Sequence, residues 1–242
     1  MKLRCVVLFL LVATSCYSQD VFKTVTFNNK KYFVADIDPK KYTVELFNKI
    51  DEINNQYSFA DIDSIKGKKL VLIVNGGMFQ KDLRPLGLYI SHGKTYMKIK
   101  GDTSGYGNFY MQPNGVFVIG RNSKPFVAPT MNYMLMGSVF PVIATQSGPL
   151  LVSDGVINSH FTQGSTNLNI RNGVGVNAEG HIIFVNSEDA VNFYEFAELY
   201  RDQLHCENAL YLDGVVSQYY APEIHKSQQT LPLGVFIVVT KK

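Results

Sequence analysis

The sequence is divided into short apolar runs that end at glycine, asparagine or aspartate, and this pattern restricts the fold to one built mainly from short β-strands. Two runs end alike: residues 71–74 pass into an Asn-Gly-Gly turn at 75–77, and residues 209–212 pass into an Asp-Gly turn at 213–214. Such a turn places a polar side chain at the tip of a buried strand, where it can face a cleft. We therefore expect the two strand ends to form parts of one site.

The remaining runs predict a chain rich in hairpins, because residues typical of tight turns separate many neighbouring runs. The expected strands are 21–27, 31–37, 42–47, 70–74, 86–90, 95–99, 116–119, 150–152, 156–157, 173–177, 181–186, 209–212 and 235–239. Many strands, several hairpins and few helices favour a single α+β domain with a mixed, mostly antiparallel β-sheet and a few packing helices.

Helices are predicted at two places. Residues 58–66 form a short helix with Ser58 as its N-cap and Gly67 as its stop. A clearer helix begins at Asn192, where Glu195 three residues on completes a capping box. Its apolar face comprises Phe193, Phe196, Ala197, Tyr200 and Leu204. The apolar segment 131–145 has no clear period, and we expect a helix or an irregular core segment there.

The N-terminus has the pattern of a secretory signal peptide. Lys2 and Arg4 precede a short apolar core at 6–13, which is too short to span a bilayer. Cleavage after Ser18 would place the mature protein outside the cytoplasm, secreted or periplasmic. A rival interpretation is lipid attachment at Cys16, because the preceding residues form an imperfect lipoprotein box, and the protein would then be an outer-membrane lipoprotein.

The predicted organisation is a signal peptide at 1–18, N-terminal strands and a short helix of the same domain at 19–66, and the main body at 67–242. Loss of the signal lowers the formal net charge from +3 to +1, with no long basic run, so nucleic acid is not an expected partner. It also leaves Cys206 as the sole cysteine, which excludes an internal disulfide. We expect Cys206 to be a small buried hydrophobe. No transmembrane segment is expected.

Several familiar catalytic patterns are missing from the sequence. There is no Gly-x-Ser-x-Gly elbow, no phosphate-binding P-loop and no dinucleotide fingerprint. The five histidines show no paired metal-ligand spacing. The short acidic pairs at 36–38 and 61–63 lack the rest of a calcium loop. We therefore predict no cofactor and no protein-only metal site, although a divalent cation could bind together with Asp213 and a phosphate.

Four short motifs occur in an informative order. They are Asn-Gly-Gly-Met-Phe at 75–79, Gln-Ser-Gly-Pro-Leu-Leu-Val at 146–152, Arg-Asn-Gly-Val-Gly-Val-Asn-Ala-Glu-Gly at 171–180, and, after an amphipathic helix, Leu-Asp-Gly at 212–214. In this order they resemble the phosphodiester glycosidase family over about residues 67–240. One departure is clear, because two glycines that usually follow the last motif are replaced here by Val215 and Val216. The chain is therefore similar to a divergent bacterial branch of the family.

The resemblance implies hydrolysis of a sugar–phosphate bond on the glycosyl side. The transition state of such a reaction carries positive charge at the sugar ring, so carboxylates should flank it. Asp213 is expected to lie beside the anomeric carbon as nucleophile, base or stabiliser, and Glu188 is the second acid/base candidate. Arg171 is expected to hold the phosphate.

Further residues are expected to bind the substrate. Asn75 and the backbone amides of Gly76 and Gly77 would orient sugar or phosphate oxygens, and Phe79 could stack on a sugar ring. The remaining candidates are Gln146, Ser147, Gly214, Ser217 and His92.

Two other classes of function stay open from the sequence. A non-catalytic protein that binds carbohydrate or a glycopolymer of the cell envelope would need aromatic platforms and hydrogen bonds but no paired acids. A structural envelope protein would lack a concave site that joins Asp213, Arg171 and Asn75.

Overall fold

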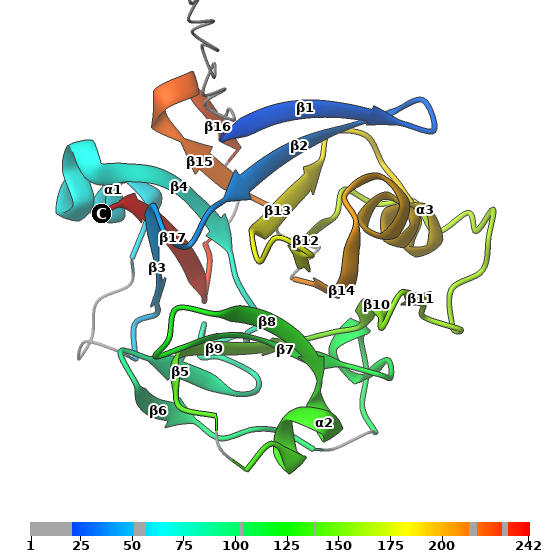
Figure 1. The fold of residues 1–242 in the computed structure, drawn as a ribbon, viewed down its shortest axis with the longest axis horizontal. Helices are drawn as coiled ribbons and strands as arrows, with labels where there is room; N and C mark the ends of the chain where they lie inside the picture. The colour runs from blue at the N-terminus through cyan, green and yellow to red at the C-terminus, as the bar shows by residue number, and fades with distance from the viewer. Residues whose placement is uncertain (1–20, 51–56, 102–103, 138, 213–216, 229–231) are drawn as a thin grey trace, which may run out of the picture.

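Three antiparallel β-sheets surround a common core in the computed structural model, which describes residues 21–50, 57–101, 104–137, 139–212, 217–228 and 232–242 (Figure 1). The first sheet has seven strands in the order β1-β2-β13-β12-β14-β10-β11. The second has the order β16-β15-β4-β17-β3, and the third has the order β6-β5-β9-β7-β8. The fold is therefore α+β in a single compact domain, as predicted.

The strands are short, as expected from the spacing of the turn residues. They are β1 Phe22–Phe27, β2 Lys30–Ile37, β3 Tyr42–Phe47, β4 Leu70–Asn75, β5 Tyr89–Ser91, β6 Lys94–Met97, β7 Gly115–Gly120, β8 Pro125–Pro129, β9 Pro141–Ser147, β10 Leu150–Ser153, β11 Val156–Ile157, β12 Asn172–Asn177, β13 Ile182–Ser187, β14 Cys206–Tyr211, β15 Tyr219–Ala221, β16 Lys226–Gln228 and β17 Phe236–Lys241. The α-helices are α1 Phe59–Lys66, α2 Thr130–Leu135 and α3 Phe193–Glu198, and α3 continues into a π-helical turn at Leu199–Gln203.

The N-terminal strands are integral parts of two sheets. Strand β2 pairs with β13 along its length, and β3 pairs with the C-terminal strand β17. Segments from opposite ends of the chain therefore share the same hydrogen-bonded ladders, and the first strands cannot form a separate unit.

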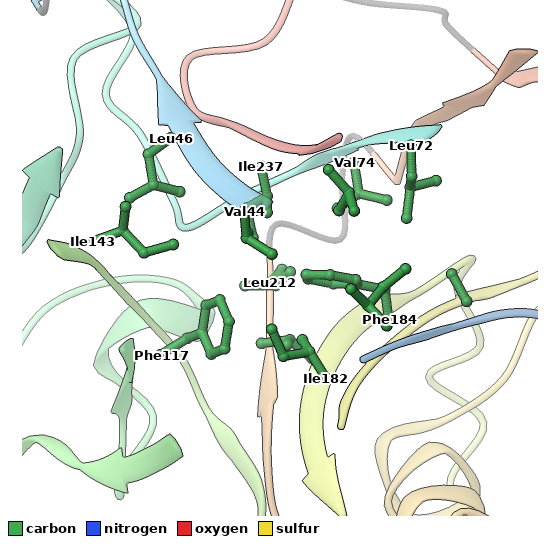
Figure 2. Packing of buried hydrophobic residues seen from close by; sticks show 14 of the residues in the cluster. Val44, Leu46, Leu72, Val74, Phe117, Ile143, Ile182, Phe184, Leu212 and Ile237 are labelled. Atoms are coloured by element: carbon green, nitrogen blue, oxygen red, sulfur yellow. The ribbon is translucent and has the colours of Figure 1, made fainter. Parts of the chain in front are cut away.

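The main core lies where the inner faces of the three sheets meet (Figure 2). Val44 and Val74 come from the second sheet, and Phe117 comes from the third. Phe184 comes from β13 of the first sheet, and Leu212 directly follows β14 of that sheet. Strand β4 is buried at all six positions, which explains its unbroken apolar sequence.

A second apolar cluster lies on the outer face of the seven-stranded sheet, which α3 covers. The predicted capping box is present, because the Asn192 side chain accepts from the Glu195 amide and the Glu195 carboxylate accepts from the Asn192 amide. Close packing of the helical segment requires glycine in β12: a Cβ at Gly175 would lie 2.9 Å from the Tyr200 ring and 2.8 Å from the sulfur of Cys206. Cys206 is buried, as predicted.

The expectation for residues 131–145 is wrong in its second half. Helix α2 is short and leaves Met131, Met134 and Leu135 exposed, and the chain then enters β9, the central strand of the third sheet. Partners on both sides of β9 supply the hydrogen bonds that favour a strand there. The sequence does not predict the strands β8, β15 and β16, because prolines stand at both ends of β8 and the other two strands have only three residues each. None of the helices in the described ranges has the length and apolar character needed to cross a membrane.

Candidate functional site

Polar residues meet at one end of the main core, where β4 and β14 end and β12 begins. The Asn75 side chain, at the end of β4, accepts hydrogen bonds from Asn172 Nδ2 at 2.5 Å and from the Gln218 amide at 3.0 Å. The Leu212 amide donates to the carbonyl oxygen of Asn172 at 3.1 Å. The motifs at 75–79, 171–180 and 212–214 therefore meet at this end of the core.

The start of β12 sends neighbouring side chains to opposite faces of the sheet. Asn172 shares the core-facing side with Val174, whereas Arg171 contacts Phe193 and Tyr211 in the cluster beneath α3. The two predicted substrate ligands Arg171 and Asn75 consequently lie at the same sheet end but on opposite faces. We call the core-facing group of Asn75, Asn172, Asn186 and Gln218 the amide cluster.

Two amides of this cluster are adjacent on β12 and β13. Asn172 faces Asn186 across the two strands, and both residues are 1% exposed. In the part of the chain that the structure describes, Asn172 Oδ1 and Asn186 Nδ2 are buried without a hydrogen-bond partner. Such atoms are uncommon in folded proteins and point to a missing partner.

Glu188 lies two residues beyond Asn186, just past the end of β13, and its amide donates to the carbonyl oxygen of Lys31 at 2.8 Å. Its carboxylate forms an ion pair with Lys226 at 2.9 Å, and both side chains are partly exposed. Lys226 also lies over the ring of Phe33, which stacks on Tyr219. The bond to Glu188 raises the pKa of Lys226, and burial raises the pKa of Tyr219. Glu188 is therefore at the solvent-accessible edge of the amide cluster.

Arg171 is buried rather than exposed at the surface. Its Nε donates to the carbonyl oxygen of Val191 at 2.8 Å, its Nη2 donates to that of Asn167 at 3.0 Å, and the ring of Phe193 lies 3.7 Å from the guanidinium carbon. Burial lowers the pKa of the guanidinium, and the Tyr211 hydroxyl opposes that shift. Since Arg171 is 1% exposed, this arrangement holds the loop before β12 against α3 and leaves no open approach for a phosphate.

The glycines after β4 allow close packing rather than an open cradle of amides. The Gly76 amide donates to the Val235 carbonyl oxygen at 2.8 Å. A Cβ at Gly77 would lie 2.4 Å from the carbonyl oxygen of Gln146, so only glycine lets the turn after β4 approach β9 this closely. The expectation that the Gly76 amide binds substrate does not fit this geometry.

Gln146 has a structural role in place of the expected substrate contact. Its Oε1 accepts from the amides of Leu88 and Lys100, each at 3.0 Å. Its Nε2 donates to the Lys100 carbonyl oxygen at 2.8 Å and to Thr130 Oγ1 at 3.2 Å. All four hydrogen-bonding positions of the amide are occupied, so none is left for a substrate.

The two predicted serines differ in their surroundings. Ser147 ends β9 next to the carbonyl that packs on Gly77, and its buried hydroxyl has no partner in the described ranges. Ser217 donates to the Ile170 carbonyl oxygen at 3.3 Å and directly precedes Gln218 of the amide cluster. Both serines remain candidates for substrate binding.

Phe79 and His92 make contacts outside the amide cluster. The Phe79 ring packs on Gly234, where a Cβ would come within 2.4 Å of it, and remains partly exposed. His92 occupies the turn between β5 and β6 with a positive φ of 50°, and its ring lies 3.5 Å from the Glu45 carboxylate. The exposed turn position matches a solvated histidine rather than a site-lining one.

Asp213 and Gly214 lie outside the described residues. The described residues on either side of them are Leu212 and Ser217. Within the described ranges, no group of three or more His, Cys, Asp or Glu side chains is arranged to hold a metal ion.

Sequence reasoning overlooked Asn172, Asn186 and Gln218. A signal for the first two was present, because the turn at 178–180 sets the register of the hairpin and places Asn172 opposite Asn186. Nothing in the local sequence singles out Gln218, whose role depends on a backbone contact with β4.

Comparison with known proteins identifies the family. The sequence pattern of the phosphodiester glycosidase family matches residues 68–240. The uncharacterized protein YigE of Escherichia coli (strain K12) is 36% identical over 183 residues, which cover 76% of this chain and 70% of that protein.

Solved structures share the fold at lower identity. The zebrafish N-acetylglucosamine-1-phosphodiester alpha-N-acetylglucosaminidase catalytic domain, auto-inhibited by its pro-peptide, has a TM-score of 0.62 and 17% identity, covering 93% of this chain and 85% of that chain. A hypothetical protein from Synechocystis has a TM-score of 0.54 and 16% identity, covering 91% and 61% of the two chains. The family match extends over most of the chain, and the protein therefore belongs to the phosphodiester glycosidase family.

Proposed function

We propose that this protein hydrolyses the bond between a sugar and a phosphodiester, on the glycosyl side, in a glycan or envelope glycopolymer. The observation that carries the proposal is the contact of Asn75, Asn172 and Gln218 at the end of the core, within a chain of the phosphodiester glycosidase family. These contacts bring together strand ends that are far apart in the sequence, as a substrate site requires.

Asp213 is our candidate for the carboxylate beside the anomeric carbon. It follows Leu212, whose amide is bonded to Asn172, and it precedes Ser217, which is bonded to Ile170. A carboxylate at this point of the sequence would stabilise the positive charge that develops on the sugar ring. A phosphodiester leaves as an anion, so the reaction needs less general-acid assistance than the loss of an alkoxide.

Glu188 is our candidate for the second acid/base group. Its carboxylate is partly exposed at the edge of the amide cluster and is oriented by Lys226. The hydrogen bonds of Arg171 are made to carbonyl oxygens of the chain itself. We therefore propose that Lys226, which is bonded to Glu188, compensates the charge of the departing phosphate.

The proposal is tested with the full mature chain and a UDP-linked sugar, by following release of the free sugar. We expect Asp213→Asn to fold normally and to lower kcat by about 10²-fold or more, because removal of a charge-stabilising group typically costs this much. Wild-type turnover by a folded Asp213→Asn protein would exclude the role of Asp213.

Two further arms complete this experiment. We propose that no cofactor takes part, so turnover should survive dialysis against EDTA, and its loss would instead indicate a divalent cation.

Calorimetry with the intact sugar phosphodiester separates hydrolysis from simple binding. Stable binding without release of sugar would support the non-catalytic carbohydrate-binding alternative.

We also propose that the chain is exported, with cleavage after Ser18 and with lipid attachment at Cys16 as the rival outcome. The intact mass of the mature protein from the native host distinguishes a start at Gln19 from a lipidated Cys16.

A further inference from the structure

On the basis of the proposed sugar hydrolysis, we propose that Asn172 and Asn186 form a subsite for one hydroxyl group of the sugar. In this subsite Asn172 Oδ1 accepts the hydroxyl proton, and Asn186 Nδ2 donates to the hydroxyl oxygen. Neither residue belongs to the substrate contacts expected from the sequence motifs.

The two side chains are placed to meet one small group. The Ser187 amide donates to the Arg171 carbonyl oxygen, so the next pair inward, Asn172 and Asn186, is a non-hydrogen-bonded pair of the ladder. Side chains of such a pair lie closest together, with about 4.5 Å between the Cα atoms. Since both side chains point to the core-facing side, one unused acceptor and one unused donor belong to directly opposite residues at the end of the core.

The orientation of Asn172 is fixed by its neighbours. The Gln218 backbone amide can only donate, so the atom of Asn75 that it contacts must be the oxygen. The atom of Asn172 that contacts the same oxygen must then be the nitrogen, which leaves the oxygen of Asn172 as the free atom. The subsite is therefore preorganised, with its acceptor held in place before a ligand arrives.

The cost of these two unpartnered atoms argues for a ligand. Both residues are 1% exposed, and a buried polar atom without a partner is a net loss for folding. Elsewhere in the described ranges buried side-chain amides are satisfied, as for Gln146 and for Asn158, whose Nδ2 donates to the carbonyl oxygens of Leu150 and Gln112. The fold can therefore supply hydrogen bonds to a buried amide, but it supplies none to Asn172 Oδ1 or to Asn186 Nδ2.

The chemistry of the pair selects a neutral hydroxyl over a phosphate. A hydroxyl group both donates and accepts, which matches one amide oxygen and one amide nitrogen. A phosphate oxygen only accepts and would be repelled by the free oxygen of Asn172. Glu188 is two residues beyond Asn186, just past the end of β13, at about 7 Å along the extended chain, so a sugar held by the pair would lie near the acid/base candidate.

The test is Asn186→Leu, which keeps the approximate volume and removes the donor. We expect its thermal stability to be equal to or higher than that of the wild type, because no hydrogen bond of the folded protein is lost. We expect kcat/KM for a UDP-linked hexose to fall 10- to 100-fold, mainly through KM. Asn158→Leu is the matched control: it removes a satisfied buried amide, so its stability should fall while KM stays unchanged.

A series of substrates that each lack one sugar hydroxyl makes the test specific. One deoxy substrate should lose 10-fold or more in kcat/KM with the wild type and lose little further with Asn186→Leu, because the same contact is already absent. Equal losses in both proteins at every position would overturn the subsite. If the variant does not fold, the wild-type series decides alone. A wild type that loses no kcat/KM with any deoxy substrate would also overturn the subsite.

Failure of the proposed function gives a different result. If the wild type hydrolyses no sugar phosphodiester, calorimetry with the free monosaccharides and their deoxy forms replaces turnover. A single deoxy position that weakens binding to the wild type but not to Asn186→Leu would retain the subsite without the hydrolysis. Absence of any monosaccharide binding would overturn both.

Discussion

Arg171 and Asn172 are neighbours in the chain, yet the two faces of the sheet treat their polar groups in opposite ways. Beneath α3, Arg171 donates to the carbonyl oxygens of Val191 and Asn167 and stacks on Phe193. On the core-facing side, Asn172 Oδ1 and Asn186 Nδ2 are buried without partners in the described residues. Satisfied polar groups hold the fold together, whereas a buried polar group without a partner is retained at a cost to stability. The hydroxyls of Tyr32 and Tyr200 beneath α3 are also buried without partners in the described residues, so the comparison concerns the two neighbours themselves. It gives the Arg171 guanidinium a structural role and supports the proposed subsite at Asn172 and Asn186.

Gln146→Leu should have the largest effect on stability and is the direct counterpart of Asn186→Leu. It removes four hydrogen bonds and leaves the amides of Leu88 and Lys100 without their acceptor. At about 1–3 kcal/mol for each buried group left unsatisfied, we expect unfolding to become easier by about 3 kcal/mol. Chemical denaturation measures this change. A variant as stable as the wild type would contradict the structural role of Gln146.

Arg171→Met should have a smaller effect. It removes the donors to Val191 and Asn167, but it also relieves the desolvation of a buried cation, so we expect a net loss of about 1–2 kcal/mol. The segment before β12 should become easier to cleave by protease, which limited proteolysis detects. KM for the phosphodiester should stay within a factor of about two, since the guanidinium is buried and bonded to carbonyl oxygens of the chain. A 10-fold higher KM at unchanged stability would restore the phosphate role predicted from the sequence.

The Cys206 thiol, a second group in the cluster beneath α3, should not react with thiol reagents in the folded protein. Burial raises the pKa of its thiol to about 12, so at pH 8 the thiolate fraction is on the order of 10⁻⁴. In a chain that carries Cys5→Ser and Cys16→Ser, thiol reagents should label Cys206 only after unfolding, as mass spectrometry can show. Rapid labelling of the folded protein would mean that this face opens to solvent.

Local sequence predicts the hairpins well because turn residues set the register over a few positions. The turn at 178–180 gives the pairing of β12 with β13, and the capping box at Asn192 gives the start of α3. Residues 141–147 could not be assigned in this way. Their strand form depends on partners in β5 and β7 that no local pattern reveals.

The sequence predicts that the strand ends near Asn75 and Leu212 meet, but it does not predict the contacts that the structure shows there. The Asn-Gly-Gly turn at 75–77 does lie at the end of the core, and Asn75 is central to the amide cluster. The roles of Gly77, Gln146 and Arg171 differ from those expected, because a side chain's hydrogen bonds depend on segments that are distant in sequence. Gln146 is satisfied by residues 46 or more positions away, apart from Thr130.

The sequence by itself determined the strand-rich fold class, the two capped helices and the family, because periodicity, turn chemistry and motif order are local properties. Tertiary structure alone decided which polar groups are satisfied. Burial and hydrogen bonding arise where three sheets converge, and only there do Asn75, Asn172, Asn186 and Gln218 become neighbours.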